Sequence, residues 1–142
     1  MKLNPQFALS FNGNCEAAFR CYERCLNGTI TFMLTWGNSP SAADAPAGWG
    51  TKIYHATLKV GDTVIMGSDQ PPDRYDQPKG FEVVLPMHDA VAAERVFQEL
   101  ADGGTVKMPL QETFWASRFG VLVDRFGIPW SVNCERIGQA TT

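Results

Sequence analysis

The segment 109–134 constrains the fold more than any other part of the chain. It contains two apolar stretches, 117–123 and 128–134, which are separated by the four residues 124–127. In each stretch the residue types alternate with a period of two, as they do in strands that have two different faces. The connection ends in Gly127, and glycine readily adopts the positive φ that tight turns require. The segment therefore predicts two strands joined by a tight turn.

One face of these two strands is less apolar than the other. It carries Arg118, Ser131 and Asn133, and Trp115 lies just upstream. A face of this composition is expected to form the wall of a pocket, since a face packed on the core would be more apolar. Trp130 shares the apolar face of its strand and is assigned to the core.

Length and composition limit the class of protein. A chain of 142 residues can form one domain, or two small halves, with a sizeable apolar interior. The net charge of -3 and the scattered Lys and Arg residues argue against a nucleic-acid partner. No apolar run reaches the roughly 20 residues of a membrane span. The N-terminal sequence lacks the apolar centre of a signal peptide, so a cytoplasmic location is expected.

The same order of elements occurs twice along the chain. Each half reads β-α-β-β-β, which predicts an α+β fold of two tandem modules, 4–69 and 81–136, joined by the polar linker 70–80. Such modules are expected to curl a mixed sheet around a cleft, with the helices on the outer face. The predicted strands of the first half are 7–11, 29–36, 53–60 and 63–68, with a helix from 15 to about 26; those of the second are 81–87, 105–110 and the pair above, with a helix ending at 101.

Three local features complete this prediction. Asn14 and Asp89 stand where side chains can cap the two helices. The segment 37–50, rich in proline, glycine, alanine and serine, is long enough to form a lid or a rim. In the strand 53–60, Tyr54 is assigned to the apolar face together with the alternate residues that follow it, and His55 to the other face.

Several strings of residues resemble the PhnB-like branch of the vicinal oxygen chelate (glyoxalase, bleomycin resistance and dioxygenase) superfamily, which is sometimes labelled 3-demethylubiquinone-9 3-methyltransferase-like. The resemblance spans nearly the whole chain. It implies tandem βαβββ modules and a homodimer, often with exchanged elements. The strings are FNGN (11–14) with EAAF (16–19) and Tyr22, HATLKVGD (55–62), MGSD (66–69), and, most specific, MPLQETFW (108–115) through DRFG (124–127) and Trp130.

The resemblance also implies where a metal ion would bind. Metal-dependent members place His, Glu or Gln ligands on the first and last strands of each half, and these places correspond here to Gln6, Met66, Glu82 and Ser131. Met and Ser are poor ligands for a hard or borderline divalent ion. Two remaining candidates fall short of the three protein ligands of a typical catalytic site. We therefore expect a metal-free pocket without a cofactor.

His55 and Glu82 are the candidate catalytic residues. If its face is the concave one, His55 is placed for acid–base chemistry or for hydrogen bonding to a ligand. The alternative is a histidine with a structural hydrogen bond or a place at a dimer seam. Glu82 can serve as a general base with a raised pKa, or it can pair with a nearby arginine.

Glu112, Trp115 and Arg118 are candidate ligand-binding residues, with Met66 and Ser131 beside them on the predicted pocket wall. A carboxylate, an indole and a guanidinium can recognise an anionic or aromatic ligand. A structural role is the alternative: Trp115 would fill space between the halves, and Glu112 would pair with Arg118 or with an arginine in the turn. The residue types alone leave both alternatives open.

The four cysteines have no assigned role. Cys21 and Cys25 are neighbours on the predicted helix and could supply half of a zinc site, but no second pair follows with ligand spacing. The favoured interpretation is that Cys15, Cys21, Cys25 and Cys134 are small buried hydrophobic residues.

The sequence therefore supports two hypotheses about function. The first is a metal-free small-molecule-binding protein. The second is a lyase, isomerase or dioxygenase-type enzyme that uses a divalent ion or acid–base chemistry at His55 and Glu82. Methyl transfer is disfavoured, because no glycine-rich nucleotide-binding turn follows the first strand.

Overall fold

The fold was analysed in a computed structural model, which describes residues 1–136. The chain divides into two compact units, Met1–Gln77 and Pro78–Thr142. The division falls within the predicted linker 70–80.

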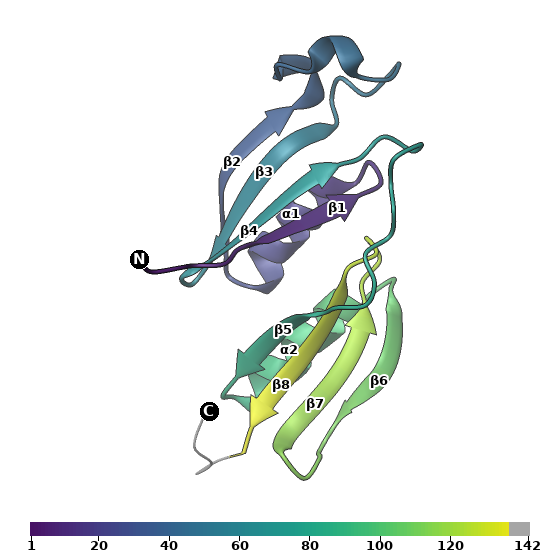
Figure 1. Ribbon diagram of the computed structural model, residues 1–142. Coiled ribbons are helices and arrows are strands. Elements are labelled where there is room, and N and C mark those ends of the chain that lie inside the picture. Colours follow the sequence, from purple (N-terminus) through teal and green to yellow (C-terminus); the bar gives the residue numbers. More distant parts are fainter. Residues whose placement is uncertain (137–142) are drawn as a thin grey trace. The chain divides into compact units, whose positions relative to one another are not determined.

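The first unit is a four-stranded mixed sheet with one helix (Figure 1). The strands follow the order β1-β4-β3-β2, in which β1 and β4 are parallel and the other neighbours are antiparallel. Two short 3₁₀ helices, Trp36–Asn38 and Ala42–Asp44, lie in the connection between β2 and β3. The elements are β1 (Phe7–Phe11), α1 (Cys15–Cys25), β2 (Thr29–Thr35), β3 (Ile53–Val60) and β4 (Thr63–Asp69).

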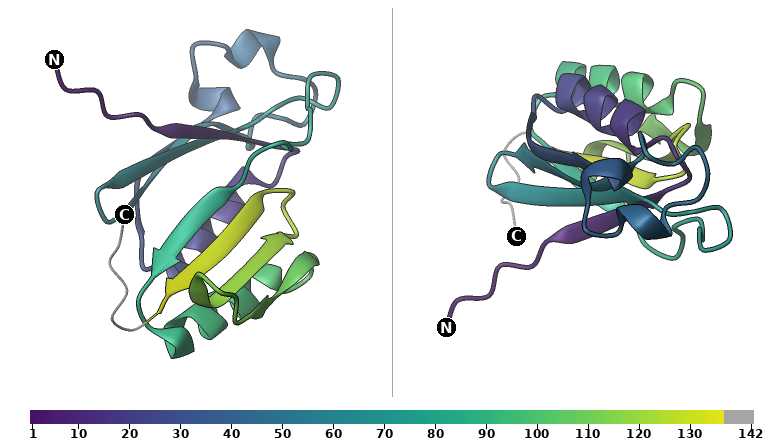
Figure 2. Two further views of the ribbon diagram at one scale, coloured as in Figure 1. Left: turned by 60° about the horizontal axis from the view of Figure 1, so that its bottom comes forward. Right: turned by 90° about the horizontal axis from the view of Figure 1, so that it is seen from above.

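The second unit repeats this plan. Its strands follow the order β5-β8-β7-β6, with β5 and β8 parallel and the remaining neighbours antiparallel. In both units the helix covers one face of its own sheet (Figure 2). The elements are β5 (Val83–Met87), α2 (Ala90–Ala101), β6 (Thr105–Gln111), β7 (Ala116–Val123) and β8 (Pro129–Glu135).

Each core lies between a helix and the helix-facing side of a sheet. In the first unit Phe19 of α1 packs so closely on Gly67 of β4 that a Cβ atom there would lie 2.7 Å from the phenyl ring. In the second unit Phe97 of α2 packs on Gly120 of β7, where a Cβ atom would lie 2.6 Å from the ring. A glycine at the centre of each sheet therefore allows close helix–sheet packing.

The prediction of two βαβββ modules in an α+β fold is confirmed. The strands form two separate four-stranded sheets, and neither closes into a barrel. Element bounds agree within one or two residues; the largest difference is at β5, which begins at Val83 instead of Phe81. The turn 124–127 forms as predicted, and Gly127 has φ 93°.

The predicted helix caps differ in outcome. Asp89 caps α2, since its carboxylate accepts a hydrogen bond from the backbone N–H of Val91 at 3.2 Å. The prediction for Asn14 is wrong. Its side chain makes no capping bond, and its Oδ1 atom is buried without a hydrogen-bond partner in the described chain. The carboxylate of Asp69 accepts the hydrogen bond at the start of α1 instead.

The faces of β7 are the reverse of the prediction. Leu122 is fully buried, and Gly120 and Leu122 stand opposite Val132 and Trp130 on the side of the sheet that contacts α2. Arg118 shares their side by strand alternation. Apolar alternation did not identify the core-facing side, because glycine supplies close packing there without a side chain.

Candidate functional site

A cavity of about 460 Å³ lies in the first unit, at the start of β3 next to the two 3₁₀ helices. Its walls come from the connection between β2 and β3, from the start of β3 and from the chain that follows β4. The lining residues are Trp36, Ser41, Asp44, Tyr54, His55, Gln70 and Arg74.

A bulge places two consecutive residues of β3 on this cavity. Thr35 pairs with Ile53 and Leu34 pairs with His55, so Tyr54 is an extra residue that has no partner on β2. A bulge interrupts strand alternation and redirects a side chain. Tyr54 therefore lines the cavity beside His55, and the prediction that it belongs to the apolar face with Ala56 is wrong.

The aromatic side chains of the cavity, Trp36 and Tyr54, are fixed by a ring contact and by hydrogen bonds. The rings of Trp36 and Tyr54 meet edge to face with their centroids 5.0 Å apart. The indole N–H of Trp36 donates a hydrogen bond to the backbone carbonyl of Asp69 at 3.1 Å. The hydroxyl groups of Tyr54 and Ser41 are 3.2 Å apart and form a hydrogen bond. The 3₁₀ segment is thereby attached to β3 and to the end of β4, and the predicted role of segment 37–50 as a rim agrees with its position.

His55 lies on the face of β3 that is directed away from α1. Its neighbours Ala56 and Leu58 are fully buried on the helix side. The imidazole Nε2 lies 3.4 Å from the hydroxyl oxygen of Thr57, and the ring lies 5.9 Å, centroid to centroid, from that of Phe32. A half-buried imidazole at a cavity wall can donate or accept a hydrogen bond to a bound molecule.

Two opposite charges line the same cavity. Asp44 ends the second 3₁₀ helix, and Arg74 lies beyond β4 in a turn where its backbone N–H donates to the carbonyl of Pro71 at 2.8 Å. Within residues 1–136, neither charged group forms a side-chain hydrogen bond or ion pair. Both remain available to a ligand.

Three residues of the predicted pocket wall, Ser131, Asn133 and Trp115, lie around the sheet face of the second unit that is opposite α2. Ser131 stands opposite Val121, and Asn133 stands opposite Phe119. Ser131 is buried, and the Oδ1 atom of Asn133 is buried without a hydrogen-bond partner in the described part of the chain. Trp115 is 40% exposed and contacts the ring of Phe119 at a centroid distance of 5.2 Å.

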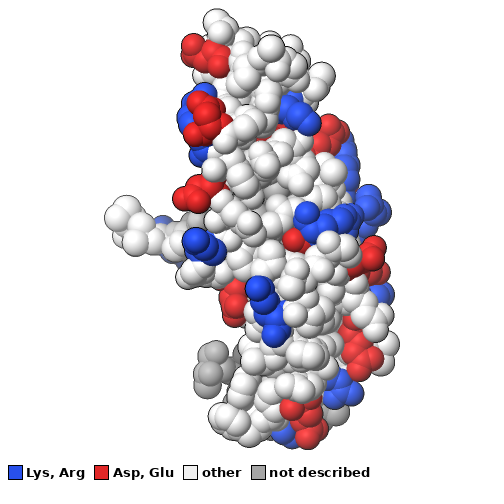
Figure 3. Space-filling model, turned by 90° about the vertical axis from the view of Figure 1, so that its right-hand side faces the viewer, with Lys and Arg blue, Asp and Glu red and all other residues white. Residues whose placement is uncertain are grey.

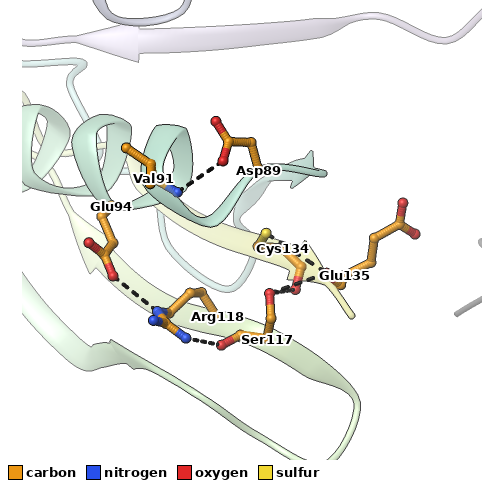
Figure 4. A network of polar contacts seen from close by, with 7 residues as sticks. All are labelled: Asp89, Val91, Glu94, Ser117, Arg118, Cys134 and Glu135. Carbon is orange, nitrogen blue, oxygen red and sulfur yellow. Dashed lines mark hydrogen bonds and ion pairs between the residues drawn. The ribbon is translucent and has the colours of Figure 1, made fainter. Parts of the chain in front are cut away.

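Arg118 does not lie with these residues. Its Nε donates to the carboxylate of Glu94 on α2 at 3.1 Å, and its Nη1 donates to the backbone carbonyl of Ser117 at 2.7 Å (Figure 4). The prediction that Arg118 shares a pocket wall with Ser131 is therefore wrong about the face. Glu112 is exposed and lies 4.0 Å from Arg136, so the predicted pairing with Arg118 or Arg125 is also wrong.

The four positions at which the resemblance implies metal ligands do not fit a divalent ion. Met66, opposite Ala8, and Ser131 offer a thioether and a hydroxyl. The two better donors, Gln6 and Glu82, fall short of the three protein ligands of a typical catalytic site. No group of three His, Cys, Asp or Glu side chains that could hold a metal ion occurs among residues 1–136.

Glu82 and His55 belong to different units, and neither unit brings the two candidate catalytic residues together. Glu82 is exposed just before β5, and its carboxylate forms no ion pair in the described chain. The predicted pairing with a nearby arginine is therefore not present.

The four cysteines are all buried, and none forms a disulfide. Cys21 Sγ and Cys25 Sγ are 3.6 Å apart on α1, a contact that places two thiols side by side. Burial raises the pKa of the Cys15 thiol far above its ordinary value, and the negative charges of Asp69 and Glu16 add to the effect. Cys15 is therefore an unreactive core residue.

Most of the cavity was not predicted from the sequence. Of its seven lining residues only His55 was a candidate. Asp44 and Arg74 stand in polar loops, where exposed charges are common and carry no pattern. The one available signal was the length of segment 37–50, which predicted a rim without naming its side chains.

Comparisons with known proteins agree with this fold. The model of the Glyoxalase/Bleomycin resistance protein/Dioxygenase superfamily matches residues 6–132. The chain belongs to this superfamily. The curated Protein YjdN of Escherichia coli (strain K12) is 37% identical over 141 residues, which cover 94% of this chain and 95% of that superfamily relative.

Two solved structures of relatives are similar over the same length. Protein PA1353 from Pseudomonas aeruginosa is 47% identical with a TM-score of 0.86, and the match covers 94% of this chain and 98% of that one. The PhnB protein from Bacillus cereus is 20% identical with a TM-score of 0.79, covering 93% of this chain and 99% of that one. At that identity the second match supports the fold alone.

The surface and the helices add two observations. On the face shown in Figure 3, Lys and Arg side chains are interspersed with Asp and Glu. Within the described chain, neither helix has the length and apolar character that crossing a membrane requires.

Proposed function

We propose that this superfamily member binds a small organic molecule in the cavity beside β3, and that it does so without a metal ion. The observation that supports this most strongly is the pair Asp44 and Arg74, two charged side chains that line one cavity and have no partner in the described chain. A volume of about 460 Å³ is within the range of small-molecule sites. The poor donor set at the implied metal positions supports the metal-free part of the proposal.

The test is a thermal-shift screen of a metabolite library with the wild-type protein and two histidine variants. A ligand that binds the folded state raises the midpoint of unfolding. We expect hits that are weakened in His55→Ala and unchanged in His88→Ala, because His88 is an exposed histidine outside the cavity. Hits that are equally strong in both variants, or an absence of hits, would count against the cavity as the binding site.

Metal dependence is tested separately by elemental analysis of the purified protein. The proposal predicts substoichiometric Zn, Mn, Ni and Fe, and ligand binding that survives treatment with a chelator. A stoichiometric ion that is lost in Glu82→Ala would overturn the metal-free proposal.

A lyase, isomerase or dioxygenase-type activity is the second candidate. One observation favours it: His55 lines the cavity, where an imidazole can act as a general acid or base toward a bound molecule. Turnover of a ligand from the screen by the wild-type protein, and its loss in His55→Ala, would establish this candidate. Methyl transfer is not proposed, since the chain lacks a glycine-rich nucleotide-binding turn after its first strand.

We also propose a homodimer in the cytoplasm. In each unit the sheet face opposite the helix carries exposed apolar side chains, such as Phe32 at 49% and Val84 at 53% exposure, which favour burial against another surface. Light scattering at micromolar concentration is expected to give twice the monomer mass, and a monomer would contradict the proposal. The location is tested by cell fractionation.

A further inference from the structure

We infer that the ligand of the cavity carries both a positive and a negative charge, with Asp44 binding the cationic group and Arg74 the anionic group. This inference rests on the proposed function and adds the chemical class of the ligand. It follows from the placement of two opposite charges around one cavity of about 460 Å³.

The two charges come from separate segments that the tertiary structure brings to one site. Asp44 belongs to the connection between β2 and β3, whereas Arg74 follows β4. Contacts next to each residue attach both segments to the sheet. The hydroxyl of Ser41 bonds that of Tyr54 on β3, and the backbone N–H of Gln70 donates to the carbonyl of Phe11 on β1 at 2.9 Å.

Asp44 and Arg74 do not neutralise one another. They line the same cavity but form no ion pair with each other or with any other side chain in residues 1–136. Both side chains are exposed and line one cavity, so a dipolar molecule can bring one charged group to each.

Ligands with a single charge fit the site less well. A molecule with only a negative charge gains from Arg74 but meets the Asp44 carboxylate, and a molecule with only a positive charge meets the Arg74 guanidinium. Like charges at one site disfavour binding, and this repulsion contributes to specificity. A neutral molecule leaves both groups without a partner.

The neutral residues of the cavity suit the remainder of such a ligand. The Nε2 of Gln70 donates to the hydroxyl of Ser68 at 3.0 Å, which directs the amide and leaves its carbonyl oxygen as an acceptor. The rings of Trp36 and Tyr54 offer an apolar surface. The class that combines these features is a zwitterion with an apolar or aromatic group, such as an α-amino acid.

The experiment uses three probes of similar shape: L-phenylalanine, which carries both charges, 3-phenylpropionate, which lacks the ammonium, and 2-phenylethylamine, which lacks the carboxylate. Dissociation constants are measured by calorimetry or by NMR titration with the full chain. The wild-type protein is expected to bind L-phenylalanine about fivefold more tightly than either singly charged probe, which is the upper end of what one exposed ion pair supplies.

Four variants assign the charges. Asp44→Asn is expected to weaken binding of L-phenylalanine about fivefold and to leave binding of 3-phenylpropionate unchanged or tighter. Arg74→Gln is expected to weaken binding of L-phenylalanine by a similar factor and to leave binding of 2-phenylethylamine unchanged or tighter. Asp62→Asn and Lys59→Gln change the net charge by the same amounts on exposed positions outside the cavity, and they should have no effect.

Two results would overturn the inference. Equal affinity for L-phenylalanine and 3-phenylpropionate, with Asp44→Asn neutral, would identify an anionic ligand and leave the proposed binding function standing. Absence of saturable binding of L-phenylalanine at millimolar concentration would also reject the zwitterion, whereas the proposed function is decided independently by the library screen and the His55→Ala variant.

Discussion

The carboxylate of Asp69, the last residue of β4, accepts a hydrogen bond at 2.9 Å from the backbone N–H of Cys15, the first residue of α1. Its second oxygen accepts the backbone N–H of Ile53, the first residue of β3, at 2.8 Å. One buried side chain therefore holds the starts of a helix and a strand. The same residue fixes the cavity, since its backbone carbonyl accepts the indole N–H of Trp36.

Replacement of Asp69 by asparagine is expected to lower the free energy of unfolding by about 2–3 kcal/mol, because an amide can accept only one of the two backbone N–H groups and leaves the other buried without a partner. The measurement is a urea unfolding curve. Asp73→Asn, at an exposed position, is the matched control and should change the free energy by less than about 0.5 kcal/mol. Equal effects of the two substitutions would contradict the role assigned to Asp69.

Because Cys15 is buried, the free energy of unfolding is expected to decrease as the pH rises in the alkaline range. The pKa of its thiol is raised in the folded protein above the ordinary value of 9.0, so the unfolded chain releases this proton first as the pH rises. The stabilisation that the protonated Cys15 thiol gives to the folded state is therefore fully present below about pH 9. Above that pH the free energy of unfolding falls by up to about 1.4 kcal/mol per pH unit. Unfolding curves of the wild type and Cys15→Ala between neutral and alkaline pH should show the steeper decline in the wild type. Parallel declines would refute the assignment.

Close packing at Gly67 and Gly120 predicts that an added methyl group destabilises each unit. Alanine at either position brings a Cβ atom against the ring of Phe19 or Phe97 and should cost about 1–3 kcal/mol. Gly50→Ala is the control, because a Cβ atom there meets no atom within 4 Å. Differential scanning calorimetry provides the comparison, and a Gly67→Ala variant as stable as Gly50→Ala would show that the ring moves aside without cost.

Trp130 and Trp115 should respond differently to the same substitution. Trp130 is fully buried, and its indole N–H donates to the Asp124 carboxylate at 2.8 Å, so Trp130→Phe removes both volume and a buried hydrogen bond. We expect a loss of about 2–4 kcal/mol in the free energy of unfolding. Trp115 is 40% exposed, and Trp115→Phe should cost less than about 1 kcal/mol. Denaturant titration followed by circular dichroism measures both variants, and similar losses would contradict the core assignment of Trp130.

The predictable part of the fold was local. Alternation in 53–60 and 63–68 located β3 and β4 to within one residue, and Asp89 correctly predicted the start of α2. These signals involve residues close in sequence, where strand or helix periodicity and capping chemistry act directly. Asn14 shows the limit of the same reasoning, because the hydrogen bond at the start of α1 goes instead to the carboxylate of Asp69, 54 residues after Cys15.

The candidate site depended on features that periodicity does not reveal. The bulge at Tyr54 turned a residue assigned to the core onto the cavity. Gly120 made the less apolar side of β7 its core side and carried Arg118 to α2. At Tyr54 the bulge interrupts the alternation locally. In β7 the alternation is intact, but a glycine at its centre lets the less apolar side pack on the helix.

The sequence by itself determined the two βαβββ modules and the superfamily, because these follow from the order and spacing of local patterns. Only the tertiary structure decided which loops meet around a cavity and which charges within it stay unpaired. That meeting is produced by contacts such as the one between Trp36 and Asp69, whose partners are distant in sequence and whose energies depend on burial in the folded chain.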